Sequence, residues 1–161
     1  MSLQDQQYSD YAEEGGVHDV DYACKYYEDD DSSRITHMAS WSNQLYIVDA
    51  GRHMVYLTDL KGKIRKYIGG DDEDYKLGKS DKPGKFTDPR CLVVDAHGNF
   101  IVAEKYRLQA FDKHGNHLSI IDVSITGITG LQMDNLGRLF AASRTNHEIY
   151  CFQVCFEIEI L

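Results

Sequence analysis

Short apolar runs separated by polar turns recur along the chain from about residue 34 onward. The stretch "DPRCLVVDAHGNFIVAEK", residues 88 to 105, shows the pattern well. One apolar run ends at Val94, a polar turn containing Gly98 follows, and a second apolar run begins at Phe100. Glycine readily adopts the positive φ that a tight hairpin turn requires, so this stretch predicts a β-hairpin.

The hairpin belongs to a unit that occurs three times, at residues 37 to 68, 88 to 121 and 128 to 154. Each copy runs strand, polar turn, strand, charged loop, strand, second turn and strand. Four short antiparallel strands in roughly 40 residues are typical of a β-propeller blade. We therefore predict an all-β fold, a partial propeller ring of about three four-stranded antiparallel blades. The expected units are blades at about 34–70, 86–123 and 125–161, with a long polar loop near 69–85.

The second copy resembles an NHL repeat, whose pattern includes G-x-F-x-x-P, an apolar strand ending in Asp, a G-N turn, a strand ending in an acid, and R-[IV]-x-x-F. The residues that match are Gly84, Phe86, Pro89, Asp95, Gly98, Asn99, Glu104, Arg107 and Phe111. The third copy keeps fewer of these residues, and the first copy is the most divergent. The resemblance implies an NHL-type β-propeller, as found in the tripartite-motif family of ubiquitin ligases.

A ring of about six such blades needs about 240 residues, so this chain of 161 residues is expected to supply an incomplete ring. The third copy also lacks its second turn, because "IYCFQVCFEIEIL" contains no Gly, Asp or Pro. Its alternation of apolar residues from Val154 to Ile160 still fits an outer strand. If that edge were unpaired, the chain would be expected to self-associate.

Charge separates the chain into two parts. The formal net charge is −9, and residues 1–33 contain ten Asp or Glu and one Lys, whereas the remainder is balanced. We predict an acidic N-terminal tail that is partly disordered. Within it, "VHDVDYACKYY" fits a strand of a preceding or closing blade as well as it fits disorder. The sequence shows no membrane-spanning run and no signal-peptide pattern, so a cytoplasmic chain without membrane association is expected.

No catalytic motif is recognisable. The sequence contains no nucleophile elbow, phosphate loop or H-E-x-x-H motif. The four cysteines, Cys24, Cys91, Cys151 and Cys155, lack the spacing of a zinc module or a disulfide framework. Acids that recur at strand ends, such as Asp95 and Asp134, are expected to accept backbone hydrogen bonds in turns. We therefore expect neither catalysis nor a metal or cofactor in this segment.

The loop after the second strand of each copy carries basic residues. Equivalent loops of successive blades emerge side by side, so these residues should form one binding face. Cations suit phosphates and planar side chains suit bases, which favours single-stranded RNA, with a partner protein as the other candidate and no DNA expected. Solvated loop residues without a ligand would explain the same pattern. The candidate residues in these loops are Arg52, His53, Lys105, Tyr106, Arg107, Arg144, Asn146 and His147, and Arg90 from the preceding interblade loop is expected to join the same face.

The resemblance implies that the segment recognises substrates for a longer, RING-type ubiquitin ligase. The alternative is an enzyme, because six-bladed lactonases and the peptidyl-amidating lyase have similar repeats and hold a metal in the channel. The candidate ligands would then be Asp49 and Glu104, with Asn43 or His97.

Overall fold

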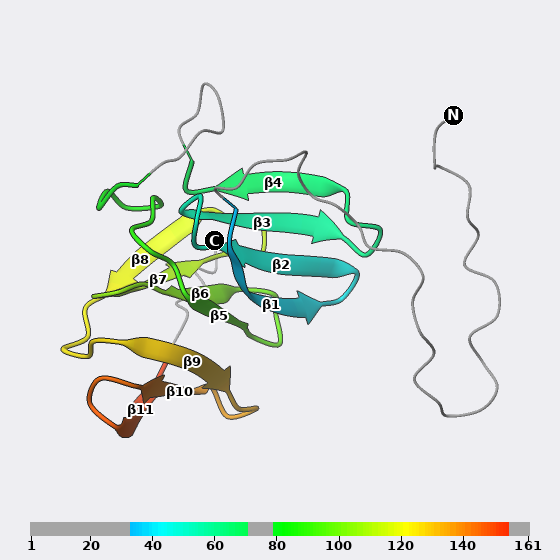
Figure 1. The fold of residues 1–161 in the computed structure, drawn as a ribbon. Coiled ribbons are helices and arrows are strands. Elements are labelled where there is room, and N and C mark those ends of the chain that lie inside the picture. Colours follow the sequence, from blue (N-terminus) through cyan, green and yellow to red (C-terminus); the bar gives the residue numbers. More distant parts are fainter. Residues whose placement is uncertain (1–32, 71–78, 155–161) are drawn as a thin grey trace, which may run out of the picture.

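The computed structural model describes residues 33–70 and 79–154, and these ranges contain strands and no helix (Figure 1). Three antiparallel sheets follow one another along the chain, which confirms the predicted all-β partial propeller. The first sheet contains β1 (Ile35–Trp41), β2 (Gln44–Asp49), β3 (Met54–Asp59) and β4 (Ile64–Ile68). The second contains β5 (Cys91–Val94), β6 (Phe100–Ala103), β7 (Leu108–Phe111) and β8 (His117–Ile121). The third contains β9 (Ile128–Met133), β10 (Arg138–Ser143) and β11 (Glu148–Gln153).

Carboxylates hold the hairpin turns, as predicted. Oδ1 of Asp95 accepts hydrogen bonds from the backbone amides of His97 and Asn99, both at 2.8 Å. Oδ1 of Asp134 accepts from the amides of Leu136 and Arg138, both at 2.9 Å. Each carboxylate therefore satisfies amides that the tight turn leaves without a strand partner.

The turn between β1 and β2 of the first blade, which diverges from the repeat pattern, is built differently. Ser42 takes the left-handed conformation, with φ of 53°. The Trp41 side chain extends to the turn of the second blade, where its Nε1 donates a hydrogen bond to the carbonyl oxygen of Ala96 at 3.0 Å. The Trp41 ring lies so close to Gly98 that a Cβ there would be 2.7 Å from it. The turns of the first two blades are thus packed against each other.

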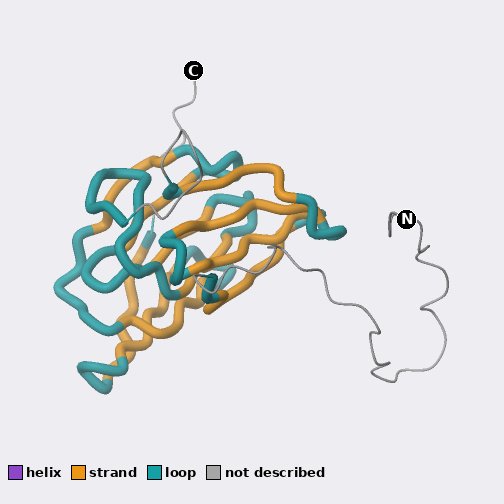
Figure 2. Tube along the Cα trace, turned by 45° about the horizontal axis from the view of Figure 1, so that its top comes forward, coloured by secondary structure: helices purple, strands orange, loops and turns teal. Residues whose placement is uncertain are grey.

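Apolar side chains fill the spaces between successive sheets. Between the first two sheets, Tyr46 and Phe111 flank Phe100, with ring centroids 5.1 Å from it in each case. Ile101 and Leu139 belong to a second cluster, between the second and third sheets. The strands β1, β5 and β9 contact one another in turn, and the tube view in Figure 2 shows the sheets layered side by side. The facing sides of successive sheets therefore bury their apolar residues against each other, which is how propeller blades are stabilised.

Some predictions lie outside the described residues: the acidic tail up to residue 32, the loop residues 71–78, and the outer strand expected from residue 155 onward. The observed strands of the three blades span residues 35–68, 91–121 and 128–153. In the described part of the chain, no helix of the length and hydrophobicity needed to cross a membrane is present.

Candidate binding face

The loops that follow the second strands lie at the same end of the sheets as the connections between blades, at the left of Figure 1. In each blade, one backbone hydrogen bond ties this loop to the segment that enters the blade: Ala50 N to Arg34 O at 2.9 Å, Arg90 N to Ala103 O at 2.8 Å, and Arg144 N to Gly127 O at 3.0 Å. We call this end the loop face; it comprises residues 50–53, 79–90, 104–107, 122–127 and 144–147. The opposite end, the turn face, comprises residues 42–43, 59–63, 95–99, 112–116 and 134–137.

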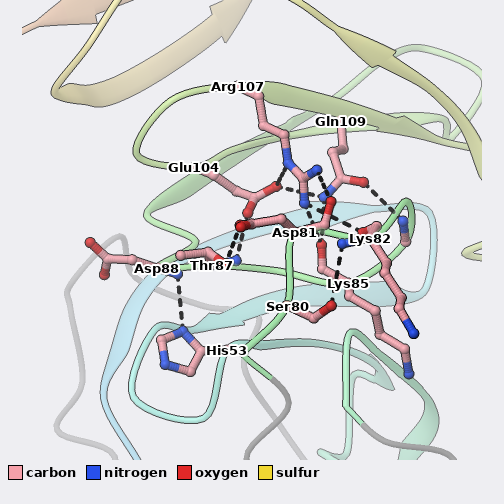
Figure 3. A network of polar contacts seen from close by, with 11 residues as sticks. His53, Ser80, Asp81, Lys82, Lys85, Thr87, Asp88, Glu104, Arg107 and Gln109 are labelled. Atoms are coloured by element: carbon pink, nitrogen blue, oxygen red, sulfur yellow. Dashed lines mark hydrogen bonds and ion pairs between the residues drawn. The ribbon is translucent and has the colours of Figure 1, made fainter.

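A buried carboxylate organises the centre of the loop face (Figure 3). Glu104 is 2% exposed. Its Oε2 accepts a hydrogen bond from the backbone amide of Thr87 at 2.6 Å, and its Oε1 accepts from Nε of Arg107 at 2.8 Å and from Nε2 of Gln109 at 2.5 Å. The charge of Glu104 is therefore balanced within the chain.

Arg107 and Gln109 bind the segment between the first two blades. The guanidinium of Arg107 donates to the carbonyl oxygens of Asp81 at 2.5 Å and Lys85 at 2.9 Å. The amide of Gln109 donates to Lys85 O at 2.7 Å and accepts from the Gly84 amide at 2.9 Å. Arg107 thus holds residues 81–87 against the second blade. Its predicted role in ligand binding stays a prediction.

Asp49 occupies the corresponding position at the end of β2 and is fully buried. Its carboxylate accepts hydrogen bonds from the amides of Arg34 at 2.8 Å and Arg52 at 3.1 Å, and from the Tyr56 hydroxyl at 3.1 Å. Asp49 therefore fixes the loop that carries Arg52 and His53.

The residues considered as metal ligands are not brought together. Asp49 and Glu104 lie at the loop face, whereas Asn43 and His97 lie in hairpin turns at the turn face. Within residues 33–70 and 79–154, no group of three or more His, Cys, Asp or Glu residues is arranged to hold a metal ion.

His53 and Arg90 contact the junction between the first two blades through Asp88. Nδ1 of His53 accepts a hydrogen bond from the Asp88 amide at 3.0 Å, and both residues have a φ of 58°. The Asp88 carboxylate pairs with Arg90 at 2.6 Å and with Arg34 at 3.2 Å. Burial lowers the pKa of His53, which keeps the ring neutral and Nδ1 able to accept.

The two loops after β6 and β10 present the most exposed candidates. Tyr106 is 60% exposed, and Nζ of Lys105 lies 4.8 Å from the centroid of its ring. Arg144 and His147 are exposed, and within the described residues the Arg144 side chain forms no hydrogen bond or ion pair. Asn146 is also exposed, but its Nδ2 donates to the Tyr150 hydroxyl at 2.7 Å.

The described residues differ in charge from the whole chain. They contain fifteen Lys or Arg and ten Asp or Glu, a formal charge of +5, whereas the complete sequence carries −9. Two of these cations, Lys79 and Lys82, are exposed on the loop face and were not among the predicted residues. The only feature of the sequence that could have indicated Lys79 and Lys82 is their position in a long charged loop.

No family model matches this chain, and no curated protein matches it in sequence. Solved structures match its fold. U3-55K has a TM-score of 0.62 and 11% identity over 79% of this chain and 38% of its own. A Bacteroides fragilis protein described as exported has a TM-score of 0.57 and 15% identity, over 73% of this chain and 32% of its own. Streptogramin B lyase has a TM-score of 0.52 and 13% identity, over 80% of this chain and 43% of its own.

These similarities establish a β-propeller-type fold. At 11% to 15% identity they say nothing about shared chemistry, and the chain spans only 32% to 43% of the length of each matched structure. The NHL type therefore stays a prediction from the repeat pattern.

Proposed function

We propose that this propeller segment is a non-catalytic binding module and that its loop face binds single-stranded RNA. The observation that supports this proposal is the exposed Tyr106 ring beside the Lys105 ammonium group, with exposed Arg144 in the corresponding loop of the next blade. An aromatic ring stacks on a base of any identity, while nearby cations neutralise the phosphates on either side of that base.

The base of the Tyr106 loop is well anchored. Arg107, the next residue, is bonded both to Glu104 and to the backbone of residues 81–87. Tyr106 is therefore presented from a fixed loop, which reduces the conformational entropy lost when a base stacks on the ring.

A protein partner is the competing ligand, because exposed tyrosine and arginine are also frequent in protein interfaces. By its resemblance to NHL repeats, the segment would serve as the substrate-recognition part of a cytoplasmic ubiquitin ligase of the tripartite-motif type. That assignment rests on the repeat pattern alone. A stoichiometric, tightly held metal in the purified protein would instead favour a propeller enzyme.

Anisotropy of a labelled single-stranded RNA of about 12 nucleotides, measured between 50 and 200 mM salt, tests the proposal. The variant Lys105→Ala/Arg144→Ala should weaken binding and reduce the slope of log affinity against log salt by about 1.4. The control Lys63→Ala/Lys113→Ala removes the same charge from the turn face and should bind like wild type. Equal losses in both variants would indicate non-specific attraction, and unchanged binding in the first variant would refute the proposed face.

Tyr106 provides a second, independent test. Tyr106→Ala removes the stacking surface and should raise the dissociation constant roughly tenfold, since stacking contributes about 1–3 kcal/mol per base. Tyr106→Phe retains the ring and should bind within about twofold of wild type. If the two variants bound RNA equally, Tyr106 would not be a stacking residue.

A further inference from the structure

The third strand of the third blade differs from its equivalents. Strands β3 and β7 are buried along almost their whole length, and each pairs with a strand on both sides in its sheet. In β11, exposed residues alternate with half-buried ones after Glu148, and Ile149 is 76% exposed. Among the described residues, β11 pairs with β10 on one side and with no strand on the other.

The backbone groups that point to this open edge can be identified. The Val154 amide donates to Gly137 O at 3.1 Å, which places Val154 in a hydrogen-bonded pair with the β10 side of the hairpin. Hydrogen-bonded pairs alternate along an antiparallel ladder. Tyr150 and Phe152 therefore bond to β10, while the N–H and C=O groups of Ile149, Cys151 and Gln153 face outward.

In the first two blades, a specific turn leads the chain back to pair with this edge. Oδ1 of Asp59 accepts from the amides of Lys61 and Lys63, at 3.0 and 2.9 Å, and Gly62 has a φ of 81°. Asp112 and Gly115 repeat this arrangement. The sequence after β11, "VCFEI" at residues 154–158, contains no Asp, Asn or Gly, so it lacks the residues that form this turn.

We propose that β11 pairs antiparallel with β11 of a second copy of this chain, about a two-fold axis at Cys151. In this register Cys151 faces its own counterpart, Ile149 faces Gln153 of the second copy, and Tyr150 faces Phe152 of the second copy. No like charges face each other, and the aromatic pairs extend the Tyr150–Phe152 stack, whose centroids lie 6.5 Å apart in one copy. The edge is therefore complementary to itself.

The pairing would join two three-stranded sheets into one continuous sheet through about six backbone hydrogen bonds. It would also remove an open strand edge, which otherwise promotes uncontrolled association. The interface is small, so we expect the dimer to have a dissociation constant in the micromolar range and to dissociate on dilution. β11 follows directly on loop-face residues 144–147, and Asn146 bonds to Tyr150, but the inference does not depend on RNA binding.

Light scattering of the full chain over a range of concentrations tests the dimer. Wild type should change from monomer to dimer, without larger species. Ile149→Lys/Gln153→Lys places like charges opposite each other and should raise the dissociation constant at least tenfold, whereas Ile149→Lys/Gln153→Glu pairs opposite charges and should retain the dimer. Both side chains are exposed, so neither variant should impair folding. A monomer at all concentrations, or a dimer that both variants leave unchanged, would overturn the proposal.

Cross-linking tests the register. In a Cys24→Ser/Cys155→Ser background, mild oxidation should produce a disulfide-linked dimer through exposed Cys151, because facing residues at this position have Cα atoms about 5.5 Å apart. Adding Cys151→Ser should abolish the covalent dimer but leave the non-covalent one. A dimer that resists cross-linking would refute pairing centred on Cys151, and higher oligomers would indicate a heterologous contact instead.

Discussion

Nε of Arg107 lies 2.8 Å from Oε1 of Glu104, and the two side chains, 16% and 2% exposed, form a buried ion pair at the centre of the loop face. The pair connects the loop after β6 to residues 81–87, which enter the second blade. Loss of this ion pair should therefore affect both the stability of the second blade and the shape of the candidate binding face.

Breaking this ion pair should destabilise the protein markedly. We expect Arg107→Ala to lower the free energy of unfolding by about 3 kcal/mol, because Glu104 would keep a buried charge without its counterion. Urea unfolding followed by fluorescence of Trp41, the single tryptophan, measures this loss. Arg138→Ala, which breaks the exposed pair with Asp134, is the control and should cost less than about 1 kcal/mol. Similar losses in the two variants would mean that the buried pair is not important for stability.

Two glycines in equivalent turns should differ in their tolerance of alanine. Gly98 and Gly137 both have positive φ, 89° and 76°, so Ala strains the backbone at each by about 1 kcal/mol or more. Only at Gly98 would the new Cβ meet a ring, that of Trp41, at 2.7 Å; at Gly137 the nearest atom is the end of Gln153 at 3.4 Å. Gly98→Ala should therefore lose about 1–3 kcal/mol more than Gly137→Ala in urea unfolding. Equal losses would argue against the docking of Trp41 on this turn.

The turn carboxylates should make stability depend on pH. Hydrogen bonds from the backbone amides of Lys63 and Arg138 lower the pKa values of Asp59 and Asp134, respectively, below 3.8. Because the pKa is depressed in the folded state, this stabilisation is present above about pH 4 and is lost as pH falls through the folded-state pKa. Asp59→Asn/Asp134→Asn should be less stable than wild type at pH 7 and should lose less stability between pH 5 and 3.

A matched control for this pH experiment is Asp122→Asn, at an exposed carboxyl in the connection between the second and third blades. This variant should follow the wild-type pH profile. If the double variant also lost stability as steeply as wild type, the turn carboxylates would not be responsible for the acid sensitivity.

The cysteines at positions 91 and 151 should react at very different rates. Burial raises the pKa of Cys91 to about 12, and only the thiolate is nucleophilic. Cys151 is exposed. In the Cys24→Ser/Cys155→Ser background at low protein concentration, a thiol reagent should modify one thiol rapidly and the second only when the protein unfolds. Rapid modification of both thiols would contradict the packing of Cys91 between the second and third blades.

The hairpins could be predicted from the sequence because their causes are local. Asp95 bonds to amides two and four residues further along the chain, and Gly98 supplies the conformation that the turn needs. The docking of Trp41 on Gly98 could not be predicted, because the two residues belong to different blades and nothing in the first turn indicates its neighbour.

The sequence by itself determined the alternation of strands and turns, the three repeated units and the basic character of the loops. Only the tertiary structure decided which of those basic side chains bond to other groups of the chain and which are exposed to solvent. Lys105 and Arg107 carry the same charge in the same loop, yet Lys105 is exposed whereas Arg107 is bonded to Glu104 and to carbonyl groups of Asp81 and Lys85. Those carbonyl partners lie more than twenty residues earlier in the chain, and they reach Arg107 only because the blades pack against each other.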